Sequence, residues 1–275
     1  MKLQNLIREV YYEPSLIAPS AHASIRRLLE ARLGETLADP QAAQRQGEDW
    51  CGEAIDLPSM EIIDGIAHIP VGGAIGHKLN GFAKGRGAVD VADIEADIDE
   101  AEANPEVKGS LLLIDSPGGM VGGTPELAGR IAATTKPIYA YSDSLIASGA
   151  YWLASATDGI FTTLTASTGS IGVYLPYLDV SAAYAEHGYK VDLIRTGKYK
   201  GMGYPGTSLS EEQRAHLQER VDTIFAMFRD QVTSGRPAVK KDAMQGQTFL
   251  AAQAFEAGLI DGIVKDKWEV ADLMR

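Results

Sequence analysis

The sequence predicts an α/β protein in which repeated strand–helix units build a parallel sheet that is covered by helices. Residues 110–115 (SLLLID) are almost entirely apolar, which is typical of a strand buried on both faces of a parallel sheet. Downstream of this run, short apolar segments alternate with segments of helical periodicity up to the C-terminus. Because ligands of such folds bind at the carboxyl ends of the strands, we expect the functional site there.

The individual elements follow from hydrophobic periodicity and turn signals. Residues 62–71 predict two short strands around an Asp-Gly turn, and residues 89–103 predict a helix with one acidic face. The strands predicted after these are 110–115, 137–141, 159–163, 191–194 and 262–264. The helices predicted among them are 124–134, 148–156, 181–187, 211–234 and 251–256.

The first part of the chain differs in composition from the rest. Residues 25–34 predict an amphipathic helix that is closed by Gly34, and residues 39–53 are polar and rich in glutamine. We therefore divide the chain into an N-terminal arm or helical extension, residues 1–58, and one α/β domain, residues 59–275.

Composition limits the classes of function. The formal net charge is −12 over 275 residues, and this disfavours a nucleic-acid surface, which needs clustered lysine and arginine. The single cysteine, Cys51, excludes an internal disulfide framework. No run approaches the ~18 apolar residues of a membrane span, and no signal-peptide core is present, so we expect a cytoplasmic protein.

Residues 147–152 (ASGAYW) place a serine between two small residues at a predicted helix start. In this position the Ser148 hydroxyl lies near backbone amides that can stabilise an oxyanion. The alternative is that Ser148 is a plain helix N-cap, and this segment alone does not separate the two interpretations.

Residues 116–119 (SPGG) follow the most apolar strand and leave the backbone open to close approach. The amides of Gly119 and Gly149 could then form the two halves of an oxyanion hole beside Ser148. The alternative interpretation of residues 116–119 is a tight turn from strand to helix.

Lys200 is the candidate base. A neutral amine near pH 7 requires its pKa to fall by about three units from ~10.4, roughly 4 kcal/mol, which burial away from carboxylates can supply. Residues 199–205 (YKGMGYP) contain no acid. Ser170, between two glycines, could orient this lysine, whereas Lys198 is interpreted as its solvent-facing neighbour. The alternatives are a turn serine and a solvated loop lysine.

No motif predicts a cofactor or a metal. The five histidines share no metal-ligand spacing: His22, His68, His77, His187 and His216. The glycines between residues 72 and 87 lack the lysine and hydroxyl residue of a phosphate-binding P-loop.

Four segments in this order resemble the signal peptide peptidase A family of serine proteases: 115–119, 147–152, 168–172 and 197–200. The match extends from about Ile62 to the C-terminus. The resemblance implies a ClpP/crotonase-like fold and a serine–lysine dyad, with Ser148 as nucleophile and Lys200 as general base. It also implies that Ser170 orients the lysine and that the amides of Gly119 and Gly149 bind the oxyanion.

Within that family, the opening of the chain is most similar to the capsid-assembly proteases of tailed phages. Membrane-anchored members carry an N-terminal transmembrane helix, whereas residues 12–34 instead resemble the start of the phage enzymes. The resemblance implies an endopeptidase that processes scaffold and capsid proteins in the procapsid, and a homo-oligomer. The alternative within the family is a bacterial cytoplasmic enzyme that degrades peptides.

Three further alternatives follow from the same fold. A ClpP-like triad needs a histidine about two dozen residues after the serine, and residues 170–174 (SIGVY) contain none. A crotonase-type acyl-CoA enzyme needs a carboxylate at the site, and few acids lie near the two glycine motifs. A catalytically inactive scaffold-associated protein stays open and predicts that Ser148 resists acylating probes.

Overall fold

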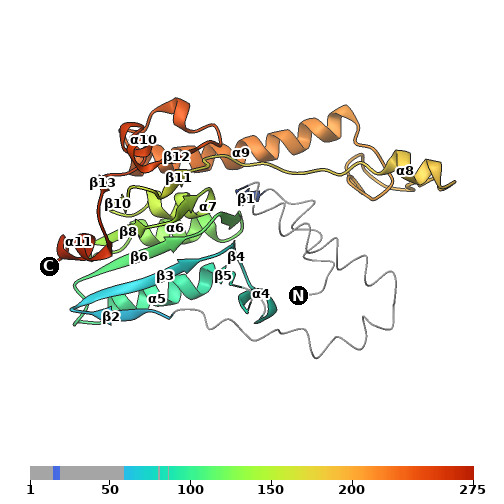
Figure 1. Cartoon of the computed structure of the whole chain (residues 1–275). Coiled ribbons are helices and arrows are strands. Elements are labelled where there is room, and N and C mark those ends of the chain that lie inside the picture. The colour runs from blue at the N-terminus through green and yellow to red at the C-terminus, as the bar shows by residue number, and fades with distance from the viewer. Residues whose placement is uncertain (1–14, 19–58, 80, 86) are drawn as a thin grey trace.

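A six-stranded sheet forms the centre of the structure (Figure 1). The computed structural model describes residues 15–18, 59–79, 81–85 and 87–275. The strand order is β13-β10-β8-β6-β3-β2, and every pair is parallel except β2 with β3. The strands are β2 (Glu61–Ile63), β3 (Ile66–Gly72), β6 (Gly109–Asp115), β8 (Ile138–Ser142), β10 (Gly159–Thr162) and β13 (Gly262–Ile263).

The apolar residues of β6 are buried on both faces of this sheet. Leu112 and Ile114 belong to the main core, whereas Leu111 packs with Val270 and Met274 on the opposite face. The main core includes residues of α5 (Val91–Ala103), α6 (Thr124–Ala132) and α7 (Gly149–Ser155). The opposite face is covered by α11 (Lys267–Asp272). The predicted parallel sheet covered by helices is therefore confirmed.

Two smaller sheets stand at the carboxyl ends of the central strands. One has the order β1-β7-β4-β5, formed by β1 (Ser15–Ile17), β7 (Gly118–Met120), β4 (Ile75–Gly76) and β5 (Val89–Asp90). The other has the order β12-β11-β9, formed by β12 (Thr248–Leu250), β11 (Ser167–Gly169) and β9 (Leu145–Ala147). A short helix, α4 (Gly81–Lys84), lies between β4 and β5 in the chain.

Residues 175–210, which we call the extension, project away from these layers and include α8 (Ser181–Glu186) (Figure 1). They return to the core along α9 (Glu211–Gly235), a helix of 25 residues. A capping box starts α9: Ser210 Oγ accepts from the Gln213 amide, and Gln213 Oε1 accepts from the Ser210 amide, both at 3.2 Å. After α9 come a 3₁₀ turn, η1 (Lys241–Ala243), and α10 (Ala251–Glu256).

Most predicted elements are confirmed within one to three residues. The strand predicted at residues 191–194 is wrong, because this segment is irregular in the structure. It pairs with no sheet in the described part of the chain, and the Ile194 side chain is therefore fully exposed. The three-residue strands β7, β9, β11 and β12 were not predicted, because strands of this length carry too little periodicity.

The predicted helix at residues 25–34 and the polar stretch at residues 39–53 lie outside the described ranges. The domain boundary between residues 58 and 59 stays a prediction. Of the predicted arm, residues 15–18 are described, and Leu16 is completely buried in the main core. Among the described residues, no helix is both long enough and apolar enough to span a membrane.

Candidate active site

Ser148 stands at the sharp junction between β9 and α7. Its backbone has φ 55° and ψ −118°, a conformation that costs a residue with a side chain about 1–3 kcal/mol and that clusters at functional sites. Similar strained strand-to-helix turns present nucleophilic serines in other hydrolases. The Ser148 amide donates to the Gly169 carbonyl at 2.9 Å, and its carbonyl accepts from the Trp152 amide at 3.0 Å. These bonds hold the residue in the strained geometry, and its side chain is buried.

Large aromatic side chains fix helix α7 behind Ser148. Trp152 stacks on Phe228 of α9, with ring centroids 4.7 Å apart and planes within 4° of parallel. The Tyr151 hydroxyl donates to the Leu259 carbonyl at 2.8 Å, and burial raises the pKa of this phenol. The orientation of Ser148 therefore depends on packing that reaches far along the chain.

Glycine is required where the backbone of β7 approaches Ser148. Gly118 has φ 89°, and a Cβ atom there would lie 2.6 Å from the Gly149 amide nitrogen. A Cβ atom at Gly149 would lie 3.4 Å from the Gly119 amide nitrogen. A Cβ atom at Gly119 would lie 1.8 Å from the Ile75 carbonyl oxygen. The two amides predicted as oxyanion donors, those of Gly119 and Gly149, are therefore close neighbours.

Ser116 supports this glycine turn and was missed in the sequence. Its hydroxyl donates to the Gly73 carbonyl at 2.6 Å and accepts from the Gly118 amide at 3.1 Å. The side chain is fully buried, so it ties β7 to the loop after β3. A serine two residues before a glycine turn is the signal that could have indicated this role.

Ser170 follows β11, which pairs in parallel with β9 so that Gly169 lies opposite Ala147. Ser148 and Ser170 therefore leave the same edge of the small sheet side by side. Ser170 also has a positive φ, 54°, and its amide donates to the Gln247 carbonyl at 2.7 Å. Both serines are buried.

Lys200 lies on the extension, with its side chain exposed. This part of the extension is tied to the start of α9, because the Gln213 side-chain amide donates to the Lys198 carbonyl at 2.9 Å. Phe228, which stacks on Trp152 in the core, comes fifteen residues after Gln213 in α9. At a rise of 1.5 Å per residue, the two residues are separated by about 22 Å along the helix axis. The structure thus brings together Ser148, Ser170 and the two glycines, and it leaves Lys200 at a distance within one chain.

The neighbouring lysine is engaged elsewhere. Lys198 Nζ lies 2.7 Å from a Glu212 carboxylate oxygen, and both side chains are exposed. Hydrogen bonds to Glu212 first, and to Tyr199 second, raise the pKa of this amine. A raised pKa holds the amine in its protonated form, which disfavours Lys198 as a base.

The strand β1 covers the site and was not predicted. It pairs antiparallel with β7, so that Leu16 lies opposite Gly119 and Ile17 opposite Gly118. The short apolar run at residues 16–18, which follows Ser15 and lies between Pro14 and Pro19, is the only local signal for this strand.

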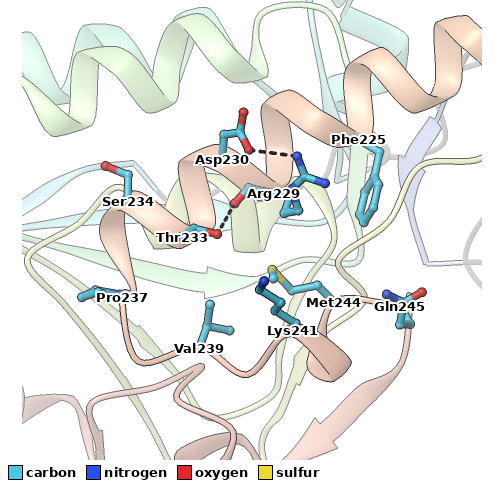
Figure 2. Close-up of a pocket in the computed structure, with 10 residues that line it drawn as sticks. All are labelled: Phe225, Arg229, Asp230, Thr233, Ser234, Pro237, Val239, Lys241, Met244 and Gln245. Atoms are coloured by element: carbon cyan, nitrogen blue, oxygen red, sulfur yellow. Dashed lines mark hydrogen bonds and ion pairs between the residues drawn. The ribbon is translucent and has the colours of Figure 1, made fainter.

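A pocket of about 690 Å³ lies beside the second half of α9, and none of the predicted site residues lines it (Figure 2). It runs between the second half of α9 and residues 237–245. On its wall, Arg229 pairs with Asp230 at 3.2 Å, and the Thr233 hydroxyl donates to the Arg229 carbonyl at 2.8 Å (Figure 2). Among the described residues, no three His, Cys, Asp or Glu side chains form a group suited to a metal ion.

Residues 130–274 match peptidase family S49, and the chain belongs to this family. The chain is 32% identical to the capsid assembly protease C of Escherichia phage lambda, over 94% of this chain and 60% of that protein. It is 27% identical to the chloroplastic serine protease SPPA of Arabidopsis thaliana, over 73% of this chain and 30% of that protein. The predicted resemblance to the signal peptide peptidase A family, and to its phage capsid-assembly branch, is confirmed.

The chain thus spans about three fifths or less of the length of these relatives. Among solved structures, an enoyl-CoA hydratase from Shewanella pealeana aligns over 83% of this chain and 77% of that one, with 13% identity and a TM-score of 0.48. The α/β architecture is defined by the strand order of this chain itself.

Proposed function

We propose that this protein is a serine endopeptidase that cleaves capsid or scaffold proteins during phage head maturation. The observation that carries the proposal is the strained, buried Ser148 beside the Gly119 and Gly149 amides. The similarity to a phage capsid assembly protease over 94% of the chain supports the substrate class. Such an enzyme would act in the host cytoplasm, inside the procapsid.

The reaction begins when Ser148 Oγ attacks the carbonyl carbon of the scissile peptide bond. Lys200 accepts the hydroxyl proton, and a hydrogen bond from Ser170 orients the amine. The Gly119 and Gly149 amides stabilise the oxyanion, and each such donor contributes about 10²–10³ to the rate in comparable sites. The leaving amine takes the proton from the lysine, and water then hydrolyses the ester to release the acid and regenerate Ser148.

The dyad is completed between two copies of the chain. Lys200 stands on the extension, away from the Ser148 of its own chain, so a neighbouring copy has to supply the amine. The surface of the extension supports this arrangement, because six of the fourteen exposed large hydrophobic residues among the described ones lie on it. They are Leu178, Tyr184, Tyr189, Ile194, Tyr199 and Tyr204. Apolar surface gathered in this way marks an interaction site.

Mixing two inactive variants tests the proposal. Ser148→Ala and Lys200→Ala should each reduce peptide cleavage at least about 1000-fold, because the two residues act as a unit. After co-assembly in equal amounts, random pairing should restore up to about a quarter of wild-type activity, since some sites combine an intact serine with an intact lysine from the neighbour.

Lys198→Ala is the matched control, because it removes an exposed ion pair and should retain activity. Turnover by Ser148→Ala at the wild-type rate would refute the proposed nucleophile. Absence of any recovery in a mixture that demonstrably co-assembles would refute the dyad between copies.

A further inference from the structure

The strand β1 lies in the site in the way that an extended polypeptide substrate would. On one edge it pairs antiparallel with β7. On the other edge the Ser15 amide donates to the Tyr174 carbonyl at 2.8 Å, and the Ser15 carbonyl accepts from the Tyr174 amide at 3.3 Å. A short segment from the far N-terminal part of the chain is therefore inserted as a middle strand between two walls. Addition of a strand in this manner is a recurring mode of peptide recognition.

The register places one particular carbonyl at the proposed oxyanion site. The Ala18 amide donates to the Pro117 carbonyl at 2.7 Å. Because hydrogen-bonded and non-hydrogen-bonded pairs alternate in an antiparallel ladder, Leu16 and Gly119 then form a hydrogen-bonded pair. The Leu16 carbonyl oxygen is therefore the group that faces the Gly119 amide.

The same carbonyl also lies beside the helix α7. A Cβ atom at Gly149 would be 3.3 Å from both the carbonyl oxygen and the Cβ atom of Leu16. A Cβ atom at Gly118 would be 2.1 Å from the Leu16 carbonyl oxygen. The Leu16 side chain is completely buried. One residue of β1 thus has its carbonyl against the glycines next to Ser148 and its side chain in an apolar site.

We infer that the peptide bond between Leu16 and Ile17 is a self-processing site of this protein. The inference rests on the proposed function and adds the first substrate, which is the chain's own N-terminal segment. Ser148 Oγ bonds to the Leu16 carbonyl carbon, and the bond to the Ile17 nitrogen breaks. The amine of Ile17 leaves with the proton, and water releases the Leu16 carboxylate. Other substrates take the place of β1 between β7 and Tyr174, with an apolar residue at the position of Leu16.

The test follows the full chain by intact mass and N-terminal sequencing, together with cleavage of an added unstructured polypeptide. Wild type should acquire a new N-terminus at Ile17, and cleavage of the added polypeptide should accelerate after a lag as the segment leaves. Leu16→Asp should abolish the cut after residue 16 and the lag. Its initial rate on the added polypeptide should be roughly tenfold higher than that of wild type, which corresponds to β1 occupying its place beside β7 in about 90% of wild-type molecules.

Two further variants make the result specific. Ala18→Pro removes the amide that donates to Pro117 without changing the core, and it should also shorten the lag. Leu164→Asp, at an exposed leucine outside the site, should behave as wild type in both assays.

The failures of the two proposals are distinguishable. If wild type cleaves the added polypeptide without a lag and keeps residues 1–16 intact, self-processing is refuted and the proposed function stands. If wild type cleaves neither its own chain nor the added polypeptide under conditions in which it assembles, both are refuted.

Discussion

The part of the molecule that holds Ser148 and the part that holds Lys200 are built in opposite ways. Around Ser148, nearly every side chain from residue 145 to 155 is buried, and aromatic stacking on α9 supports the turn. In the extension, no residue from 175 to 210 is buried, and its contacts are local, such as the 2.9 Å hydrogen bond between the Ser181 and Ser208 hydroxyls. The region around Ser148 is therefore fixed by the fold of one chain, whereas nothing within the described part of the chain buries the extension that carries Lys200. Under the proposed function, a neighbouring copy covers it.

The largest expected effect concerns the anchor of α9. Phe228→Ala removes a fully buried ring that stacks on Trp152, and it should lower the free energy of unfolding by about 3–5 kcal/mol. Ile194→Ala in the extension should change the stability of the isolated chain by less than about 0.5 kcal/mol, because its side chain is already exposed. Urea denaturation at low protein concentration measures both; equal losses in the two variants would contradict the contrast between the regions.

The next effect concerns the backbone at the site. Gly119→Ala would place a Cβ atom 1.8 Å from the Ile75 carbonyl oxygen, so β4 and β7 must separate and the amide must move. We expect a loss of about 10²–10³ in kcat, similar to removal of one oxyanion donor. Gly122→Ala is the control, since a Cβ atom there meets nothing within 4 Å and no positive φ is involved. Steady-state peptide hydrolysis would show the difference, and similar kcat values for the two variants would remove Gly119 from the mechanism.

A smaller effect is expected on assembly. Ile194→Asp puts a charge into the exposed apolar surface of the extension, and it should weaken self-association by roughly tenfold, equivalent to about 1.4 kcal/mol. Sedimentation velocity over a concentration series measures this change. Leu164→Asp, which lies outside the extension, should leave association unaltered; an equal weakening in both variants would argue against the extension as the contact surface.

The smallest effect concerns the pH dependence of the core. His68 of β3 is buried against Trp268, with ring centroids 5.5 Å apart. Burial first, and then the charges of Lys267 and Arg275, lower the pKa of this imidazole, while Glu61 opposes them. Below about pH 6.5 the unfolded chain therefore binds more protons, so stability is lost as the pH falls.

His68→Phe removes this contribution. The fall in melting temperature between about pH 7.5 and pH 5.5 should be smaller in the variant than in wild type, by thermal denaturation monitored with circular dichroism. An identical fall in both proteins would show that His68 does not contribute to the acid sensitivity.

The sequence predicted the central sheet because its strands carry strong local signals. The apolar run 110–115 and the Asp64–Gly65 turn specify their structures without help from distant residues. Ser148 and Gly119 were singled out in the sequence for a related reason, because glycine and a small hydroxyl residue are the side chains that fit such close backbone contacts. In each case the physical constraint acts within a few residues.

Other features depend on contacts between distant segments. The strand β1 has only three residues, and its pairing with β7 joins positions about one hundred residues apart, so no periodicity indicates it. Residues 191–194 have the composition of a strand but no sheet edge to join. Lys200 could likewise be proposed from the sequence, but the position of the extension that carries it could not. That position depends on the direction in which α9 leaves the core.

Helix α9 also has a mechanical consequence. Its 25 residues form a helix about 37 Å long. Phe228 and Val232 pack one end of the helix into the main core, and the other end is joined to the extension. Because the length of this helix is fixed, Lys200 can reach the Ser148 of a neighbouring copy only when the two copies lie at one particular distance from each other. The proposed dyad therefore cannot form in dilute, unassembled chains. Newly made copies would stay latent, and proteolysis would switch on only where many copies are confined together.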